Sequence, residues 1–264
     1  SYLIAGSLVY KDLLTLSVLG SAAYERAVIQ TRGVDKENIL PTIQPIVIDK
    51  HQMGNPWVNY SVFLVNGIIP GIFQLTIIMM TIFVIGFEIK NRTSKSWLKK
   101  SNYSLAVGLA GKLAPYTILF IIIGLSGNVL IFKTMNFPMN GSFILFSFGT
   151  ILLVLAAQAV GIFIIGLLPV LRVAISIGAI FSILSVTYTG FTFPIEAMPP
   201  MAQGASLLFP VRHYYLFYVK EALLGAGPSV SIIHLCAIMC FLILPFVVYY
   251  RLKEAAIKMN YPIK

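Results

Sequence analysis

Residues 88–116 read EIKNRTSKSWLKKSNYSLAVGLAGKLAPY and lie between two long apolar runs. The stretch is strongly basic, because one acid, Glu88, stands against six basic residues: Lys90, Arg92, Lys95, Lys99, Lys100 and Lys112. Basic loops between membrane spans stay on the cytoplasmic side, since Lys and Arg resist translocation. The stretch therefore predicts a membrane protein and fixes the orientation of its other segments.

The same stretch predicts a short amphipathic helix. Thr93 or Ser94 can cap this helix, and Trp97, Leu98, Leu105 and Leu109 give it an apolar flank beside its lysines. A short amphipathic helix beneath a membrane either lies on the lipid surface or docks onto a soluble partner. We favour the soluble partner.

The composition also indicates a membrane protein. The chain has 264 residues, of which 58% are hydrophobic and only 11% charged, whereas soluble domains contain about 25% charged residues. A net charge of +10 in a soluble protein would suggest nucleic acid as a partner. Here the basic excess flanks apolar runs, as the inside-positive rule requires, so we expect a lipid bilayer and no nucleic acid.

The predicted fold class is a membrane all-α bundle, with the transmembrane domain over residues 59–250. The apolar runs are 60–87, 113–132, 142–168, 173–189 and 229–250, which makes five visible spans. The segments expected on the cytoplasmic side include the loop 88–112 and the tail 251–264. One orientation satisfies the charges, because the inside segments hold ten Lys and Arg and the outside segments after residue 59 hold three.

Residues 1–58 read as part of a small extracytoplasmic α/β domain. Apolar residues at helical spacing predict a helix over 8–32, a second short helix follows Gly33, and QPIVIDKHQ at 44–52 predicts a short strand. Five basic and five acidic residues balance each other in this segment. No signal peptide is visible at its start, so we expect a further, sixth span upstream of the printed chain.

Residues 190–228 are too polar and too rich in proline for a span, yet too apolar for a free loop. We interpret them as a re-entrant hairpin at the outer leaflet, because irregular backbone at membrane depth must be buried in protein or line a cavity. The hairpin holds a polar group made of Glu196, Arg212, His213 and Glu221. These residues either satisfy one another and the backbone or contact a proton or a substrate.

No set of residues predicts catalysis or a metal site. The sequence GLAGKL at 108–113 departs from a phosphate-binding loop, because Leu113 stands where Ser or Thr would hold magnesium. Two intramembrane amides, Gln74 and Gln158, predict either hydrogen bonds between helices or a substrate path. A channel or carrier that does not use ATP, and a membrane-embedded enzyme, stay open as alternatives.

Three groups of residues, in chain order, carry a resemblance to a known family. The first lies at the entry to the 60–87 span and consists of Asn55-Pro56, Asn59-Tyr60, Pro70 and Gln74. The second is Glu88, Thr93, Trp97 and Leu98, followed by Gly111-Lys112 and Pro115-Tyr116. The third is Phe193-Pro194, Met198-Pro199, Pro210 and His213-Tyr214. Together they resemble the permease subunits of ABC type-2 transporters that carry an extracytoplasmic domain after their first span.

The resemblance covers essentially the whole chain and implies one half of an efflux system in the bacterial cytoplasmic (inner) membrane. Such a permease pairs with a second permease, as a homodimer or heterodimer, and with cytoplasmic ATPase subunits. ATP and magnesium belong to the ATPase, so this chain is expected to hold no cofactor and to be no enzyme. A periplasmic adaptor is a further expected partner of residues 1–58. One departure is Arg92, where many relatives have Gly.

The resemblance also assigns roles to named residues. The residues expected to couple to the ATPase are Glu88, Thr93, Lys95, Trp97, Leu98, Lys99 and Lys100. The residues expected at the outer gate are Phe193, Pro194, Glu196, Pro199, Pro210, Arg212, His213 and Glu221. The substrate path would pass Gln74 and Gln158.

Overall fold

The computed structural model describes residues 2–31 and 60–258, and these residues contain helices but no strand. The chain divides into two compact units, residues 1–52 and 53–264. In the first unit, one long helix, α1 (Tyr2–Thr31), exposes Leu13, Leu16 and Leu19. This helix begins six residues before the predicted start. The second helix and the strand predicted after Gly33 lie outside the described residues.

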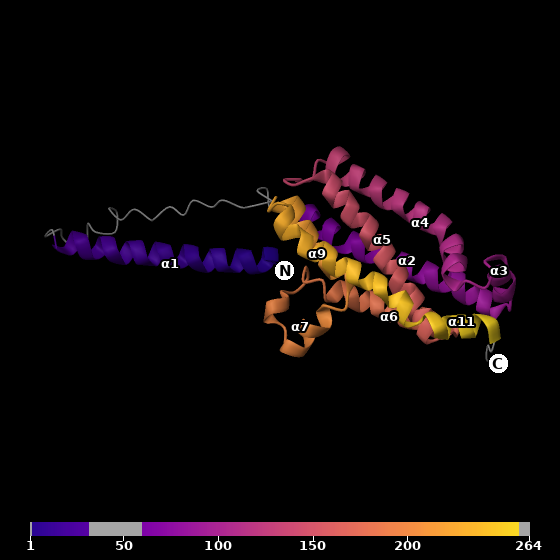
Figure 1. Cartoon of the computed structure of the whole chain (residues 1–264). Coiled ribbons are helices and arrows are strands. Elements are labelled where there is room, and N and C mark those ends of the chain that lie inside the picture. The colour runs from indigo at the N-terminus through magenta and orange to yellow at the C-terminus, as the bar shows by residue number, and fades with distance from the viewer. Residues whose placement is uncertain (1, 32–59, 259–264) are drawn as a thin grey trace. The chain divides into compact units, whose positions relative to one another are not determined.

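The second unit is a bundle of long helices joined by short helical pieces (Figure 1). Its long helices are α2 (Tyr60–Lys90), α4 (Leu105–Val129), α5 (Phe143–Leu167), α6 (Leu171–Thr187) and α9 (Pro228–Cys240). The pieces between them are α3 (Ser94–Lys100), the π-helical turns η3 (Leu130–Thr134) and η5 (Val219–Leu223), the 3₁₀ turn η4 (Ile195–Ala197), α7 (Pro200–Ser206) and α8 (Pro210–Tyr218). After α9 the chain continues through η6 (Phe241–Ile243), α10 (Leu244–Val247) and α11 (Tyr249–Lys258).

Four helical segments of the described part are long and apolar enough to cross a membrane. They are Leu64–Lys90, Leu105–Thr134, Phe143–Leu167 and Pro228–Val247. The fourth predicted run forms α6, a shorter apolar helix of 17 residues. This architecture confirms the prediction of a membrane all-α bundle.

Helix α5 is the centre of the bundle, with 78% of its apolar window buried, compared with 17% for the window of α4. Small residues let its neighbours approach closely. A Cβ atom added at Gly161 would lie 2.8 Å from the Cβ of Thr81 on α2, and one at Gly149 would lie 2.4 Å from the Phe217 ring on α8. The glycines of α5 therefore let side chains of α2 and α8 pack directly against its backbone.

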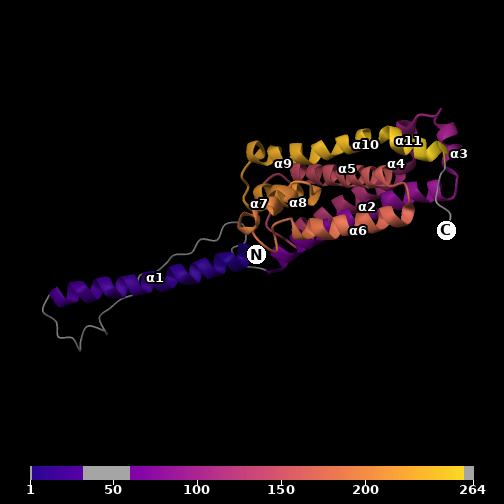
Figure 2. The same cartoon turned by 90° about the horizontal axis from the view of Figure 1, so that it is seen from below.

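The long helices run roughly along one axis, as Figures 1 and 2 show in two views. One end of the bundle, here called the α3 end, holds α3, α11, the last turns of α2 and the first turns of α4. The other, the α7 end, holds α7, α8, η4, η5 and the start of α9. One buried cluster extends to the α3 end through Leu98 and Leu252, and a second gathers around Phe217 near the α7 end.

Candidate functional site

The α3 end contains the residues predicted to couple to an ATPase. Helix α3 begins after Thr93, which occupies the N-cap position but makes no side-chain bond to the helix. The Thr93 hydroxyl donates instead to a carboxylate oxygen of Glu88, at the end of α2. The sequence correctly indicated a helix start at Thr93 or Ser94, but the structure gives the Thr93 side chain a different partner.

Glu88 also receives a hydrogen bond and ion pair from Lys112 of α4. The Glu88 and Lys112 side chains are only 20% and 24% exposed, so their attraction is screened less than at an open surface. One carboxylate thus links the last turn of α2, the start of α3 and the second turn of α4. The predicted span 113–132 lies within the helical segment Leu105–Thr134, which α4 and η3 form together, and Lys112 is a residue of α4.

A second link joins α3 to α11. The buried hydroxyl of Ser94 donates to the backbone carbonyl of Ala256 at 2.7 Å. Leu98, one turn further along α3, is fully buried in the same cluster as Leu252 of α11. Burial of an aliphatic side chain and of a satisfied hydroxyl both favour the docked position of α3.

Trp97 of α3 packs against α4 at Gly108. A Cβ atom added at Gly108 would lie 2.3 Å and 2.7 Å from two atoms of the Trp97 ring. Only a glycine therefore leaves room for the ring on this face of α4. The Trp97 indole nitrogen is buried and has no hydrogen-bond partner among the described residues, so packing alone holds the ring.

The residues predicted for ATPase coupling thus divide into two groups. Glu88, Thr93, Trp97 and Leu98 make contacts within the chain and hold α3 in place. The exposed surface of α3 consists mainly of its lysines, Lys95, Lys99 and Lys100.

Arg92, just before α3, adopts φ = 60°, in the left-handed region that favours glycine. The glycine that the family resemblance leads us to expect here would adopt this conformation without strain. Arg92 can adopt it at a conformational cost that glycine does not have.

At the α7 end, two of the polar residues grouped in the sequence, Glu221 and His213, bond partners outside that group. Glu221, 1% exposed, accepts a bond from the Ser142 backbone N–H at 2.9 Å and from the Ser231 hydroxyl at 2.7 Å. Since Ser142 is the N-cap of α5, the Glu221 carboxylate lies where a helix N-terminus favours negative charge. Glu221 therefore joins η5, α5 and α9.

His213 bonds a different segment. Its Nε2 atom lies 3.0 Å from the carbonyl oxygen of Leu207, and burial lowers the pKa of the His213 ring. Glu196 is exposed on η4, and Arg212 is half-buried on α8. The partners of Glu221 and His213 thus come from outside the predicted group of four.

The prolines and Phe193 of the predicted gate shape the chain around these groups. Pro199 is the N-cap of α7 and Pro210 is the first residue of α8, positions that suit proline because no helical N–H is needed there. Pro194 precedes η4, and the Phe193 side chain is 50% exposed. A gating role of these residues stays a prediction.

The two intramembrane amides both bond a neighbouring helix. Gln74 of α2 donates to the Ser185 hydroxyl of α6 at 2.9 Å, and the Thr117 hydroxyl of α4 donates to Gln158 of α5 at 2.9 Å. Each bond is an interhelical link of the kind the sequence predicted. A role in a substrate path stays a prediction.

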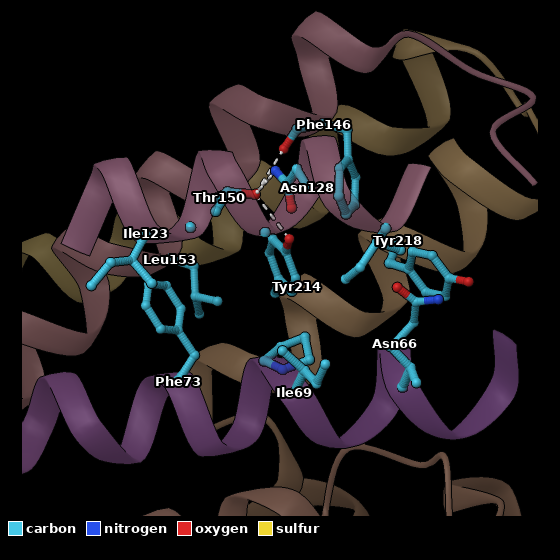
Figure 3. A pocket seen from close by; sticks show the side chains of 15 residues that line it. Asn66, Ile69, Phe73, Ile123, Asn128, Phe146, Thr150, Leu153, Tyr214 and Tyr218 are labelled. Atoms are coloured by element: carbon cyan, nitrogen blue, oxygen red, sulfur yellow. Dashed lines mark hydrogen bonds between the residues drawn. The ribbon is translucent and has the colours of Figure 1, made fainter. Parts of the chain in front are cut away.

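A pocket of about 160 Å³ lies among α2, α4, α5 and α8 (Figure 3), and sequence reasoning missed it. Its wall holds a polar network in which the Asn128 amide and the Tyr214 hydroxyl bond Thr150 at 2.8 and 2.9 Å. The Thr150 hydroxyl lies 3.3 Å from the Phe146 carbonyl, to which it can donate. The polar residues Asn128 and Thr150 within apolar runs were the available signal.

No group of three or more His, Cys, Asp or Glu residues in the described part could hold a metal ion. Comparison with protein-family models matches residues 4–250 to a model described as "ABC-2 family transporter protein". A comparison with curated proteins gave no match. The family match confirms the family resemblance seen in the sequence, while the extracytoplasmic domain and the additional upstream span stay predictions.

Proposed function

Because this chain belongs to the ABC-2 family of transporter proteins and is a multi-pass membrane protein, we propose that it is the permease subunit of an ATP-driven ABC exporter. In this proposal a separate cytoplasmic ATPase binds and hydrolyses ATP with magnesium. Two permeases, identical or different, form the translocation path. The membrane is the bacterial cytoplasmic membrane, with the α3 end on the ATPase side.

The observation that carries the proposal is the way α3 is held. Three separate contacts tie α3 to three different helices: Thr93 to Glu88 of α2, Trp97 against Gly108 of α4, and Ser94 to the Ala256 carbonyl of α11. A helix attached in this way cannot move alone. Displacement of α3 by a partner would be transmitted to α2, α4 and α11 together.

The exposed lysines of α3 supply the surface for that partner. Lys95, Lys99 and Lys100 project from a seven-residue helix whose other side is buried. A complementary acidic surface on an ATPase would be attracted to them and oriented by them. Closure of the ATPase would then push on α3 and tilt α2 and α4. The ion pair between Glu88 of α2 and Lys112 of α4 joins these two helices directly.

The test reverses the charge of the α3 surface. We expect Lys95→Glu, Lys99→Glu and Lys100→Glu, combined in one variant, to reduce co-purification of the ATPase with the tagged chain and to uncouple ATP turnover from transport. The matched control is Lys133→Glu, another exposed lysine, on η3. Unchanged association and coupling in the triple variant would remove the role proposed for α3.

The orientation has its own test. A cysteine introduced at Lys99 should react with a membrane-impermeant maleimide only after the cell membrane is opened. A cysteine at Lys133 should react in intact cells. Labelling of the Lys99 position from outside would contradict the proposed topology.

A further inference from the structure

Two asparagines line the pocket among α2, α4, α5 and α8, which we call the asparagine pocket. Asn66 comes from α2 and Asn128 from α4, and the two residues are 5% and 6% exposed. The amide nitrogen of Asn66 donates to the Val62 carbonyl at 3.0 Å, and that of Asn128 donates to the Thr150 hydroxyl at 2.8 Å. Neither amide oxygen has a hydrogen-bond partner among the described residues.

Both amide oxygens can be reached by a ligand. The Tyr218 hydroxyl, which lines the same pocket, is unpaired and fully buried, whereas neither asparagine oxygen is fully buried. In Figure 3 both oxygens lie on the side of their amide groups that faces Tyr214. Since polar groups in protein interiors are almost always paired, the two oxygens are acceptors that a bound molecule can use.

The bonded partners identify which amide atoms are the oxygens. A carbonyl can only accept, so the Asn66 atom that faces Val62 must be the nitrogen. The Thr150 hydroxyl has one hydrogen, which it can donate to the Phe146 carbonyl at 3.3 Å, and it then accepts from the Asn128 nitrogen. The pocket therefore presents oxygens, and it selects a ligand that donates hydrogen bonds.

The size and lining of the pocket favour one aromatic ring. Its volume is about 160 Å³, and an apolar cavity of about 150 Å³ binds one benzene molecule. The rings of Phe73, Phe146 and Tyr214 line it, and aromatic rings pair favourably in offset or edge-to-face arrangements. No charged side chain lines the pocket, so an ion would lose its hydration without gaining an opposite charge.

The pocket opens between two membrane-spanning segments. Ile69 of α2 and Ile123 of α4 line it and are 48% and 46% exposed, while its other lining residues are buried or half-buried. Both isoleucines belong to segments that are long and apolar enough to cross a membrane. A ligand therefore enters from the hydrocarbon region, which excludes sugars and glycerol because their many hydroxyls would lose hydrogen bonds with water there.

From these observations we propose that the asparagine pocket binds a small, uncharged phenol dissolved in the membrane. The ring lies among the aromatic side chains, and its hydroxyl donates to the Asn66 oxygen. The Asn128 oxygen accepts from a second donor where the ring carries one. The proposal does not depend on the ATPase or on the direction of transport.

The experiment uses the full chain alone, in lipid nanodiscs. Two photoactivatable probes are compared at equal concentration in the lipid: a phenol that carries a diazirine, and its methyl ether, which keeps the ring but cannot donate. We expect the phenol to label residues 65–73 and 123–131 preferentially. Because one net hydrogen bond corresponds to about a two- to twelvefold change in affinity, Asn66→Leu should lower phenol labelling by that factor and leave ether labelling unchanged.

Asn66→Leu is a suitable variant because the printed bond of Asn66 lies within its own helix, so no link between helices is lost. The control is Gln74→Leu, which removes another buried amide of α2 that bonds Ser185 and does not line this pocket. This control should label like the parent chain. Equal labelling by the phenol and the ether, or undiminished phenol labelling of Asn66→Leu, would overturn the proposal.

A blocking variant tests the location. Gly127 lines the pocket, and a Cβ atom added there meets nothing within 4 Å, so Gly127→Leu should fill the space and reduce labelling by both probes. Gly111→Leu is the matched control, because Gly111 is equally open on the same helix but does not line the pocket. Equal labelling of the two glycine variants would place the phenol elsewhere and overturn the proposal.

Competition tests the chemistry of the ligand. Unlabelled phenol should displace the phenol probe better than cyclohexanol, which has the hydroxyl without the aromatic ring. It should also displace the probe better than benzylammonium, which has the ring with a charge. Stronger competition by either of these two compounds would overturn the assignment of an uncharged phenol.

Discussion

Gly108→Ala is the most direct perturbation of the contact between α3 and α4. The added methyl group would lie 2.3 Å from one Trp97 ring atom, 2.7 Å from another and 3.0 Å from the Ser101 hydroxyl. Carbon atoms prefer a separation of about 3.5–4.0 Å, so the ring must retreat by about 1.2 Å. Overpacking of this kind costs about 1–3 kcal/mol.

Gly111→Ala is the matched control, because it makes the same change one turn away on α4. A Cβ atom added at Gly111 meets nothing within 4 Å, so this variant should show only the gain of about 0.5–1 kcal/mol for alanine in a helix. The difference between the variants is then about 1–3 kcal/mol. It corresponds to a shift of about 5- to 160-fold in the equilibrium between docked and displaced α3.

Tryptophan fluorescence can measure this shift. The chain has two tryptophans, so Trp57→Phe leaves Trp97 as the single reporter. In that background Gly108→Ala should shift the emission to longer wavelength and increase quenching by iodide, while Gly111→Ala should do neither. Identical emission and quenching in the two variants would refute the packing argument for α3.

Two further predictions concern carboxylates that each bond two other segments of the bundle. Glu88→Gln should destabilise the protein by about 1–3 kcal/mol, a value between those for exposed and buried ion pairs. Adding Lys112→Met to this variant should restore part of the lost stability. The exposed control Glu254→Gln should leave the thermal melting temperature unchanged. Glu221→Leu should destabilise by about 1–3 kcal/mol, because leucine accepts neither bond and leaves the Ser142 N–H without its acceptor, whereas exposed Glu196→Leu should melt like the parent protein. A Glu221→Leu variant as stable as the parent would show that the carboxylate does not hold η5, α5 and α9 together.

The sequence indicated a short helix with a basic surface that begins at Thr93 or Ser94, but it placed Leu105 and Leu109 on that helix. In the structure α3 ends at Lys100, and these two leucines belong to α4. Gly108, Gly111 and Lys112 read as part of a connecting loop before a span at 113. In the structure α4 begins at Leu105, capped by Ser104, and two of these residues, Gly108 and Lys112, have tertiary partners. Gly108 leaves room for the Trp97 ring, and Lys112 forms an ion pair with Glu88. A glycine and a lysine that are typical of a loop therefore make contacts within the helix bundle.

At the α7 end the sequence grouped Glu196, Arg212, His213 and Glu221 because they are near one another along the chain. In the structure Glu221 forms hydrogen bonds with Ser142 and Ser231, and His213 forms one with the Leu207 carbonyl. Ser142 lies 79 residues from Glu221 in sequence, and no local pattern marks it as a partner. The same holds for Thr150, Asn128 and Tyr214, which meet only when three separate segments pack together.

The sequence by itself determined that this protein is a helical membrane bundle of its family with a basic segment between two spans. The free energy of transferring a segment from water to lipid depends on the apolar and charged residues that the segment contains. It can therefore be judged from the sequence before the fold is known. Only the tertiary structure decided which polar groups pair and which glycine faces Trp97. Hydrogen bonds and packing act over a few ångströms, and the distances between helices are fixed only when the whole bundle has assembled.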